Sequence, residues 1–548
     1  MVNNQERTPL LFLSIFITLL VPSLTAPAAD LIASCLATNH VTNFTLVPNS
    51  NNDPSLYNNL LEFSIQNLRF LAPKFTKPTA IILPQTKEQL ASTVLCCKQA
   101  MLGIKIRCGG HSYEGLSSVA SNGSPQFVIV DMMNLNEVSV DIESKTAWVE
   151  GGATLGETYY AIAESSDSHG FSAGSCPTVG SGGHIAGGGF GLLSRKYGLA
   201  ADNVVDALLL DSQGRLLDRE AMGEDVFWAI RGGGGGIFGI IYAWKIRLVQ
   251  VPQVVTSFIV SRPGSVHEVA ELIHKWQFVG PQLDDGFYMS VFVGAGLPEV
   301  KTIGMSATFK VFYLGPKSGV LSTLNQVFPE LGIVEDDCQE MSWIESILFF
   351  SGLPSGSPLS ALKDRYLHDK NYFKAKSDYV KAHIPRSGIR SALKALAQEP
   401  KGYVILDPYG GIMSRISSDT IPFPHREGNL YTIQYLVGWS KEANENRNNY
   451  MDWMTRFYHS MTPYVSKDPR VSYVNYVDLD LGSMEPGVNA TSIISSDAVE
   501  IARSWGEKYF LGNYDRLVRI KTIIDPDNVF NNQQGIPPMS AISLEAQM

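Results

Sequence analysis

Residues 173–191 constrain the fold more than any other segment, because eight of these nineteen residues are glycine. Each glycine adds backbone entropy that folding must remove, so a regular helix or strand is disfavoured here. A flexible surface linker is one interpretation, but Ile185, Phe190 and Leu192 interrupt the polar character of linkers. Glycine-rich backbone is also tolerated where it must lie against a bulky, rigid ligand. We therefore interpret this segment as a ligand-binding loop.

A second glycine loop spans residues 107–115, with the sequence RCGGHSYEG. The adjacent Gly109 and Gly110 allow a turn with exposed amides, which can hold phosphate oxygens. The preceding residues 104–106 are strand-like, so the loop would open at the end of a strand. The alternative is a tight turn that happens to contain His111. A flavin with its pyrophosphate is a ligand that would suit such glycine-rich surroundings.

A third glycine run, residues 231–239, contains Gly234, Gly236 and Gly239 in the spacing G-x-G-x-x-G. That fingerprint marks a dinucleotide site only where a strand precedes it and a helix follows. Here residues 240–246 alternate in polarity as a strand does. The sequence therefore argues against a Rossmann-type NAD site.

Length and composition predict a globular protein of two or more domains. The 548 residues exceed the size of one ordinary core, and 45% are hydrophobic while 18% are charged. The net charge of -10 argues against nucleic acid or an anionic membrane as the main partner, because phosphate binding needs clustered Lys and Arg. The net charge says little else about function.

The first 28 residues are typical of a secretory signal peptide. Arg7 precedes an apolar run at residues 10–21, and the small-residue pattern Ala26-Pro27-Ala28 follows. The run is shorter than the roughly 20 residues that span a bilayer, so an anchor is the weaker interpretation. We expect cleavage and no membrane attachment afterwards.

In the secretory pathway, sequons can be glycosylated and cysteines can form disulfides. Glycans could be carried by Asn43, Asn122 and Asn489, of which Asn122 is the weakest because a proline follows its sequon. Six cysteines in so long a chain suggest one or two disulfides. Cys35 lies just after the expected cleavage site, and its partner is Cys96 or the neighbouring Cys97. Cys176 has no obvious partner.

Three regions follow the N-terminal segment of residues 29–74. Residues 75–250 are dense in glycine, with short strand-like runs at 127–130 and 147–149. Residues 251–472 alternate strands (257–260, 288–293, 305–313) with helical windows (266–279, 388–398), which predicts a sheet covered on one face by helices. Residues 473–540 contain helical segments at 499–510 and 514–523. The fold class is α+β.

Several motifs together resemble plant members of the berberine bridge enzyme-like family, within the vanillyl-alcohol oxidase class of flavoproteins. They are the G-G-H loop, the C-P-T-V-G segment at 176–180, F-W-A-I-R at 227–231, Y-V-N-Y at 473–476 and D-L-D at 478–480. Matching signatures run from Cys35 to Pro537. The resemblance implies a two-part FAD-binding domain at 75–250, a substrate-binding domain at 251–472, and a C-terminal segment at 473–540 that returns to the FAD domain.

The resemblance implies FAD held by two covalent bonds. His111 would bond through a ring nitrogen to the flavin 8α-methyl carbon, and Cys176 through sulfur to C6. Two tethers fix the ring and shift its electronics toward a stronger oxidant. No metal is expected. Further cofactor contacts are implied for Arg107, Gly109, Gly110, Ser112, Thr178, Val179, Gly180, Gly183, His184, Gly239 and Asn475.

The same resemblance makes Tyr476 the catalytic base, which takes a proton from a substrate hydroxyl while hydride leaves carbon for flavin N5. A phenol of ordinary pKa near 10 must be poised by its neighbours for this role. A tyrosine that merely caps a strand is the alternative. Tyr113 would lie nearby. Strand alternation places Thr432 and Gln434 on one face, and the family points this face into the substrate pocket.

Several positions depart from relatives that oxidise monolignols. Thr432, Phe190, Val477 and Met289 stand where those relatives carry Lys, Tyr, Arg and a nearby pocket Arg. The changes remove charge and hydroxyl groups, so a more apolar pocket is expected, suited to aromatic or prenylated substrates rather than sugars. Val179 resembles members whose reduced flavin reacts readily with O2. Cys108 and Ile237 also depart, without a functional explanation.

We therefore predict a monomeric FAD-dependent oxidase of specialised metabolism. It would oxidise an alkaloid, a phenolic or a prenylated phenolic, with molecular oxygen as acceptor and hydrogen peroxide as product. The alternatives are a carbohydrate or monolignol oxidase, a pericyclase that keeps its flavin without redox chemistry, and a secreted binding protein without catalysis. The cell wall, the vacuole and an ER-derived vesicle are the candidate locations.

Overall fold

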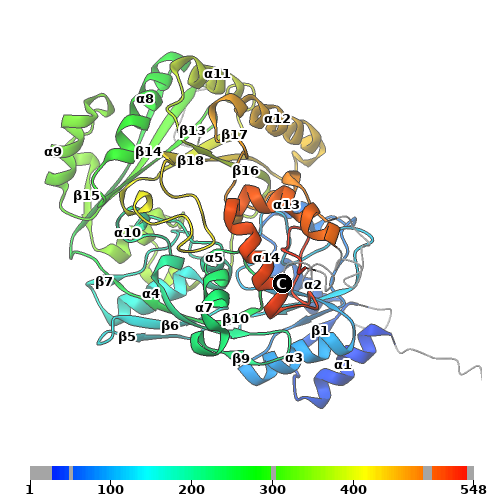
Figure 1. Ribbon diagram of the computed structural model, residues 1–548. Coiled ribbons are helices and arrows are strands. Elements are labelled where there is room, and N and C mark those ends of the chain that lie inside the picture. Colours follow the sequence, from blue (N-terminus) through cyan, green and yellow to red (C-terminus); the bar gives the residue numbers. More distant parts are fainter. Residues whose placement is uncertain (1–26, 49–53, 298–303, 485–495, 540–548) are drawn as a thin grey trace, which may run out of the picture.

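The computed structural model describes residues 27–48, 54–297, 304–484 and 496–539 (Figure 1). Most of the predicted signal peptide and the sequon of Asn489 lie outside the described residues. The chain forms three main β-sheets, each with its own hydrophobic core against helices. The cavity described below lies where these parts meet.

The first sheet is built from the N-terminal part of the chain. Its strand order is β1-β2-β4-β3, with β2 and β3 parallel to β4 and β1 antiparallel to β2. All five residues of β4 are buried, because helices cover both faces of this sheet. The elements are α1 (Ala28–Thr38), β1 (Phe44–Leu46), α2 (Ser55–Phe63), β2 (Ala80–Ile82), α3 (Lys87–Gln99), β3 (Gly103–Arg107) and β4 (Phe127–Asp131).

The second sheet is antiparallel, with the strand order β5-β6-β10-β8-β9. Helix α7 comes before the third glycine run and strand β10 after it, the reverse of a Rossmann unit. The prediction from residues 240–246 is thus confirmed. The elements are β5 (Val138–Asp141), β6 (Thr146–Glu150), α4 (Leu155–Ser165), β7 (His169–Gly170), α5 (Ser181–Ala186), α6 (Ser194–Tyr197), β8 (Val204–Leu210), β9 (Leu216–Leu217), α7 (Arg219–Ile230), β10 (Ile240–Arg247) and β11 (Val249–Gln250).

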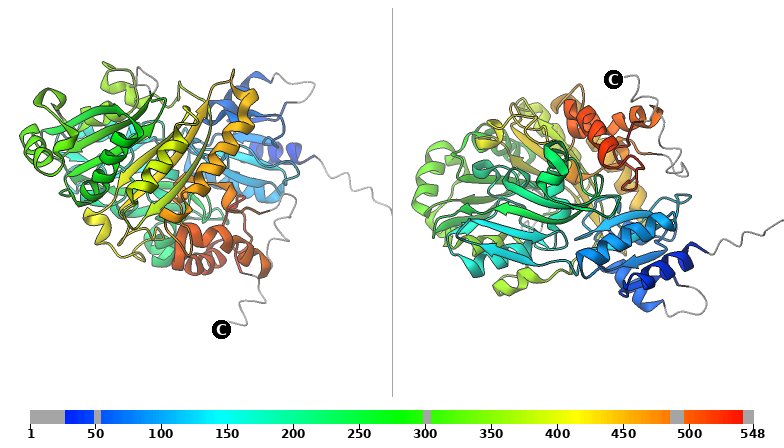
Figure 2. Two further views of the ribbon diagram at one scale, coloured as in Figure 1. Left: turned by 90° about the horizontal axis from the view of Figure 1, so that it is seen from above. Right: turned by 60° about the horizontal axis from the view of Figure 1, so that its bottom comes forward.

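The third sheet has seven antiparallel strands in the order β15-β12-β14-β13-β17-β18-β16. Four helices cover one face (Figures 1 and 2), so alternate strand residues pack under them and the others face the cavity. The strands are β12 (Val255–Gly264), β13 (Phe287–Gly294), β14 (Met305–Tyr313), β15 (Gln339–Met341), β16 (Tyr372–Val380), β17 (Gly402–Pro408) and β18 (Tyr431–Trp439). The covering helices are α8 (Val266–Val279), α9 (Lys317–Val327), α11 (Arg386–Leu396) and α12 (Arg447–Ser460). Helix α10 (Trp343–Phe350) contacts both β12 and α4.

The C-terminal helices α13 (Ser496–Phe510) and α14 (Tyr514–Ile524) pack back against the glycine-rich part of the chain. The anchor is the buried Lys521, whose ammonium donates to the carbonyl oxygens of Ile237 and Phe530 and to Asp525, each at 2.6 Å. The C-terminal segment is therefore fixed beside the third glycine run.

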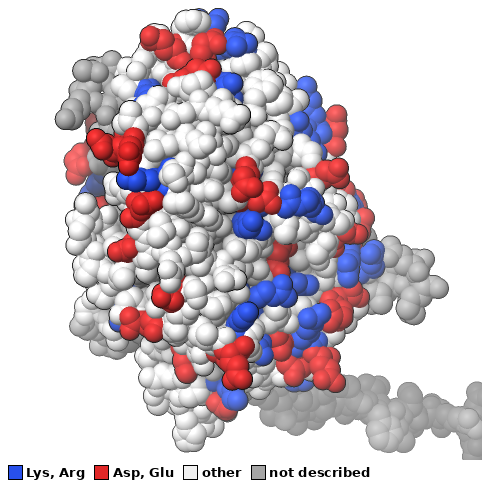
Figure 3. Space-filling view, turned by 90° about the vertical axis from the view of Figure 1, so that its left-hand side faces the viewer, with Lys and Arg blue, Asp and Glu red and all other residues white. Residues whose placement is uncertain are grey.

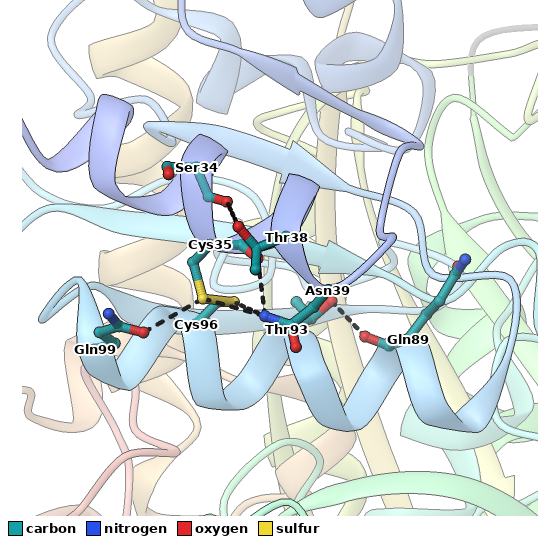
Figure 4. The surroundings of a disulfide bond; sticks show 8 residues. All are labelled: Ser34, Cys35, Thr38, Asn39, Gln89, Thr93, Cys96 and Gln99. Carbon is teal, nitrogen blue, oxygen red and sulfur yellow. Dashed lines mark hydrogen bonds between the residues drawn. A yellow bond between two sulfur atoms is a disulfide. The ribbon is translucent and has the colours of Figure 1, made fainter.

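A disulfide joins Cys35 of α1 to Cys96 of α3, with their Cα atoms 5.6 Å apart. The two helices lie side by side, and the Asn39 side chain donates to the Cys35 carbonyl oxygen at 2.9 Å (Figure 4). Of the two candidate partners, Cys96 is thus the one bonded, whereas Cys97 is a free thiol buried in the core.

Acidic and basic side chains are interspersed on the face shown in Figure 3. Among the helices of the described residues, none is both long and apolar enough to cross a bilayer. Asn122 is exposed and Asn43 is half-buried, so both sequons within the described residues lie at accessible positions.

We predict that breaking this disulfide destabilises the first sheet and the helices α1 and α3 that pack on it. The bond closes a loop with a sequence separation of 61, and removing such a constraint raises the entropy of the unfolded chain. Cys35→Ala with Cys96→Ala should lower the free energy of unfolding by about 2–4 kcal/mol in denaturant titration. A Cys97→Ala variant should keep the cross-link in thiol alkylation; loss of the cross-link there would contradict the pairing.

Candidate functional site

A cavity of about 530 Å³ lies between the glycine loops and the uncovered face of the seven-stranded sheet. Its volume falls within the range of ligand and cofactor sites. The wall is formed by residues within 104–117, 174–192 and 234–241, by Asn531, Asn532 and Gln534, and by the groups described below. The cavity therefore brings together motifs that are far apart in the sequence.

The first two glycine loops touch through their backbones. A Cβ atom on Gly109 would lie 2.4 Å from the Gly180 nitrogen, and one on Gly180 would lie equally close to the Gly109 nitrogen. Gly110 has a φ of 71°, and a Cβ there would lie 1.9 Å from the Ser64 carbonyl oxygen. Only glycine allows this approach. It sets the position of His111, the next residue in the chain.

His111 and Cys176 both line the cavity and both contact the side chain of Thr178. The His111 Nε2 atom lies 2.8 Å from Thr178 Oγ1, and the Cys176 sulfur lies 3.6 Å from the same oxygen. Burial lowers the pKa of His111 to about 4, so its imidazole is neutral at neutral pH. Cys176 takes part in no disulfide and is half-buried.

His184, on the short helix α5, supports the backbone beside Cys176. Its Nε2 atom accepts from the Gly174 amide at 3.0 Å, so the neutral ring carries its proton on Nδ1. Burial lowers the pKa of His184 to about 4 as well. Asn475 fixes this helix from the C-terminal side, because its amide donates to the His184 carbonyl oxygen at 2.9 Å.

Tyr113 and Tyr476 form a stacked pair in the cavity wall, with ring centroids 5.5 Å apart and planes 5° apart. The Gln434 amide donates to the Tyr113 hydroxyl at 2.6 Å. Burial, then the nearby Tyr113 and Asp407, raises the pKa of Tyr476. The protein alone therefore keeps this phenol protonated. A base that acts near neutral pH would instead need a lowered pKa, as expected above for Tyr476.

Two predicted site residues lie elsewhere. Arg107 is fully buried behind the loop, where it pairs with Asp131 at 2.7 Å and donates to the carbonyl oxygens of Leu60 and Leu61. Its guanidinium is thus occupied, and Arg107 does not line the cavity. The Thr432 hydroxyl donates to the Asp378 carbonyl oxygen at 3.0 Å and does not line the cavity either. Both expectations are corrected.

The structure places the other residues predicted to contact the cofactor in the cavity wall or, for Thr178, directly beside it. Thr178 touches the cavity groups through its hydroxyl, as described above. The others belong to the cavity wall: Gly109, Gly110, Ser112, Val179, Gly180, Gly183, His184, Gly239 and Asn475.

The sheet wall contains a charged group that was not predicted from the sequence. Asp407 of β17 accepts a 2.5 Å hydrogen bond from the Tyr288 hydroxyl of β13, and both residues line the cavity. Burial raises the pKa of Asp407 to about 6. The expected apolar pocket thus contains a carboxylate. The signal was a lone acid directly after the apolar run of residues 403–406.

A second missed residue is Lys105, a lone cation between two isoleucines of β3. Its ammonium donates to the Leu116 carbonyl oxygen at 2.8 Å, and the residue lines the cavity. Burial lowers the pKa of Lys105 to about 8. β3 is an edge strand, so this side of the first sheet is open to the cavity.

A buried ion network holds the stacked tyrosines from behind. The Lys374 ammonium contacts Glu114 at 2.5 Å and Asp478 at 2.7 Å, and Lys376 contacts Asp478 at 2.7 Å and Asp480 at 2.5 Å. Burial alone would lower the pKa of Lys374, but the carboxylates outweigh it and raise that pKa. Glu114 follows Tyr113 directly, and Asp478 lies two residues after Tyr476, so β16 fixes both tyrosine segments.

Known proteins share both the sequence and this architecture. Residues 78–219 match the FAD binding domain family, and residues 472–537 match the family described as berberine and berberine like. Berberine bridge enzyme-like D-2 of Nicotiana tabacum is 60% identical over 536 residues, or 96% of this chain and 94% of that protein. Reticuline oxidase of Eschscholzia californica is 50% identical over 538 residues, or 98% and 96%.

The solved structure of berberine bridge enzyme from Eschscholzia californica superposes with a TM-score of 0.88 and 50% identity, covering 93% of this chain and 99% of that one. This chain belongs to the berberine bridge enzyme-like family. Like its relatives in that family it is an FAD-dependent oxidase, and FAD is its cofactor. The α+β fold predicted from the berberine bridge enzyme-like motifs is confirmed.

The cavity of this berberine bridge enzyme-like chain fits FAD. A Cβ atom on Gly183 would meet nothing within 4 Å, so bare backbone faces open space at this wall. The Ser117 hydroxyl oxygen is buried in the wall without a hydrogen-bond partner among the described residues. Backbone without side chains, an unsatisfied hydroxyl and the buried Lys105 suit a bulky ligand that carries a pyrophosphate.

We predict that Lys374→Met destabilises the protein, because Glu114 and Asp478 would lose the cation between them. Removing one partner of a buried ion pair leaves uncompensated charge and should lower the free energy of unfolding by about 3–5 kcal/mol. The matched control is Lys381→Met, the same change at an exposed position just after β16. Equal unfolding midpoints for the two variants would show that the network does not hold the tyrosine segments.

Proposed function

We propose that this oxidase holds its FAD by two covalent bonds, through His111 and Cys176, and oxidises a small specialised metabolite with molecular oxygen as acceptor. The observation that carries the proposal is that His111 and Cys176 both line the cavity and both contact the Thr178 hydroxyl. The bound flavin would supply the hydride-accepting and oxygen-reducing chemistry.

The surroundings of the two attachment residues support this assignment. A neutral imidazole has a free nitrogen lone pair for bond formation, and burial keeps His111 neutral. Cys176 is free of any disulfide and faces the cavity. Cys108 also lines the cavity, but burial raises the pKa of its thiol to about 12, which disfavours the reactive thiolate. Cys176 is therefore the better attachment residue.

Tyr476 is the proposed proton acceptor for a substrate hydroxyl. Its stacking on Tyr113, and the hydrogen bond from Gln434 to Tyr113, hold the phenol in a fixed orientation toward the cavity. Because burial raises the pKa of Tyr476, the proton transfer requires a compensating change in charge when the substrate and cofactor are bound. Val179, at the position associated with oxygen access, lines the same cavity.

The substrate proposed is an alkaloid, a phenolic or a prenylated phenolic, and oxidative cyclisation is the proposed continuation. Phe190, Tyr288, Phe292 and Ile405 give the cavity aromatic and aliphatic walls, which favour such molecules over sugars. The names of two relatives describe them as reticuline oxidases. Hydrogen peroxide is the proposed reduced product.

A secreted monomer is the proposed state of the protein. The Cys35–Cys96 disulfide forms in oxidising compartments, which agrees with a cleaved signal peptide. Asn43 and Asn122 are the proposed glycan sites within the described residues, and Asn489 is a third one outside them. The cell wall, the vacuole and an ER-derived vesicle stay as candidate locations.

The test is anaerobic mixing of the holoenzyme with alkaloids, prenylated phenols, monolignols and oligosaccharides. We expect bleaching of the flavin absorbance by a member of the first two classes, and stoichiometric peroxide when oxygen is readmitted. Binding without bleaching would instead indicate a pericyclase or a binding protein. Bleaching by oligosaccharides alone would contradict the substrate class.

We predict that Tyr476→Phe slows this bleaching by about 10²–10⁴-fold, the range for loss of a positioned proton acceptor. The change keeps the ring and its stacking on Tyr113, so flavin content and ligand affinity should be retained. Tyr366→Phe, at a tyrosine that is 39% exposed, is the matched control. A rate within twofold of the unaltered enzyme would exclude the phenol as the proton acceptor.

A further inference from the structure

Asp407 is a carboxylate that the fold itself does not neutralise. It is 6% exposed and lines the cavity from β17. Its carboxylate accepts a hydrogen bond from the Tyr288 hydroxyl, at 2.5 Å to Oδ1. None of the ion pairs among the described residues includes Asp407, although twenty-three other contacts of this kind occur there. The second carboxylate oxygen is therefore available to a ligand.

The pair of Asp407 and Tyr288 carries one negative charge at neutral pH. Burial raises the pKa of Asp407 only to about 6, and the Tyr288 hydroxyl and the charge of Lys310 oppose that rise. Burial and the neighbouring carboxylate raise the pKa of Tyr288, so the phenol stays a neutral donor. A buried charge without a counter-ion is unfavourable. A cationic ligand in the cavity would relieve that cost.

The walls next to Asp407 are aromatic. The Phe190 ring lies 6.2 Å from the Tyr288 ring and stacks on Tyr409 at 5.1 Å. Phe292 lines the same side, and the Lys310 ammonium lies over the Phe292 ring at 4.2 Å. Aromatic faces attract organic cations. The combination of one carboxylate with several rings is suited to a protonated amine.

We propose that Asp407, oriented by Tyr288, binds the protonated amine nitrogen of the substrate, which selects a basic alkaloid over neutral phenolics and sugars. The inference rests on the proposed oxidase function and narrows its substrate class. It concerns recognition only. The ammonium would donate to the free carboxylate oxygen of Asp407, while the rings of Phe190 and Phe292 cover the carbon atoms of the substrate.

The test compares two probes of the same shape, N-methyl-tetrahydroisoquinoline and its uncharged carbon analogue 2-methyltetralin, by calorimetry on the holoenzyme at about pH 8. At that pH the probe amine is largely protonated and Asp407 is ionised. We expect the amine to bind about 10- to 100-fold more tightly than the hydrocarbon, the range for a hydrogen bond to a charged group.

Asp407→Asn should abolish this preference, so that both probes bind with similar affinity, while the hydrocarbon affinity stays unchanged. Asparagine keeps the size and the acceptor for Tyr288, and Asp407→Glu should restore part of the preference if folding is preserved. The matched control is Asp336→Asn, an exposed position far along the chain. Flavin content and unfolding midpoint verify that each variant is intact.

Equal affinities for the two probes in the unaltered enzyme, or an unchanged preference in Asp407→Asn, would overturn the proposal. These outcomes are separate from failure of the oxidase function. An enzyme that prefers the amine but is never bleached by any substrate would retain the subsite and lose the oxidase assignment. If neutral phenols bleached the flavin equally well in the unaltered enzyme and in Asp407→Asn, the oxidase function would stand and the amine subsite would be lost.

Discussion

The close contact of two glycine loops at Gly109 and Gly180 underlies the whole site. Their backbones approach to a distance that no side chain would allow, and the residues next to this contact are those that point into the cavity. His111 lies two residues after Gly109 in one loop, and Cys176 lies four residues before Gly180 in the other. The many glycines of residues 173–191 are therefore explained by close packing of backbone at the cofactor cavity. A flexible linker would not require such close contacts.

The wall formed by the seven-stranded sheet and the two stacked tyrosines is held in place by buried ion pairs. Lys374 and Lys376 on β16 bind the acids that flank Tyr113 and Tyr476, so the sheet and the two tyrosine segments are held as one unit. Charges within this network satisfy one another. Asp407 on β17 has no such partner among the described residues, and this difference separates a group that supports the fold from one available to a ligand.

Local sequence patterns predicted the positions of helices and strands well. They predicted poorly which side chains are buried behind the cavity and which of them line it. Strand β14 and helix α8 match their predicted ranges, because period-2 and period-3.6 patterns with clear caps are local signals. Alternation correctly put Thr432 and Gln434 on one face, but whether a residue on that face reaches the cavity depends on what covers it. Arg107 was misjudged and Asp407 was missed for the same reason, since their partners come from distant segments.

Retention of pigment by denatured protein tests the central claim most directly. If His111 and Cys176 are both bonded to the flavin, acid precipitation should leave the yellow colour in the pellet for the unaltered enzyme. The single variants His111→Ala and Cys176→Ala should retain it through the remaining bond, and only the double variant should release it. Release of all pigment into solution from the unaltered enzyme would contradict the account.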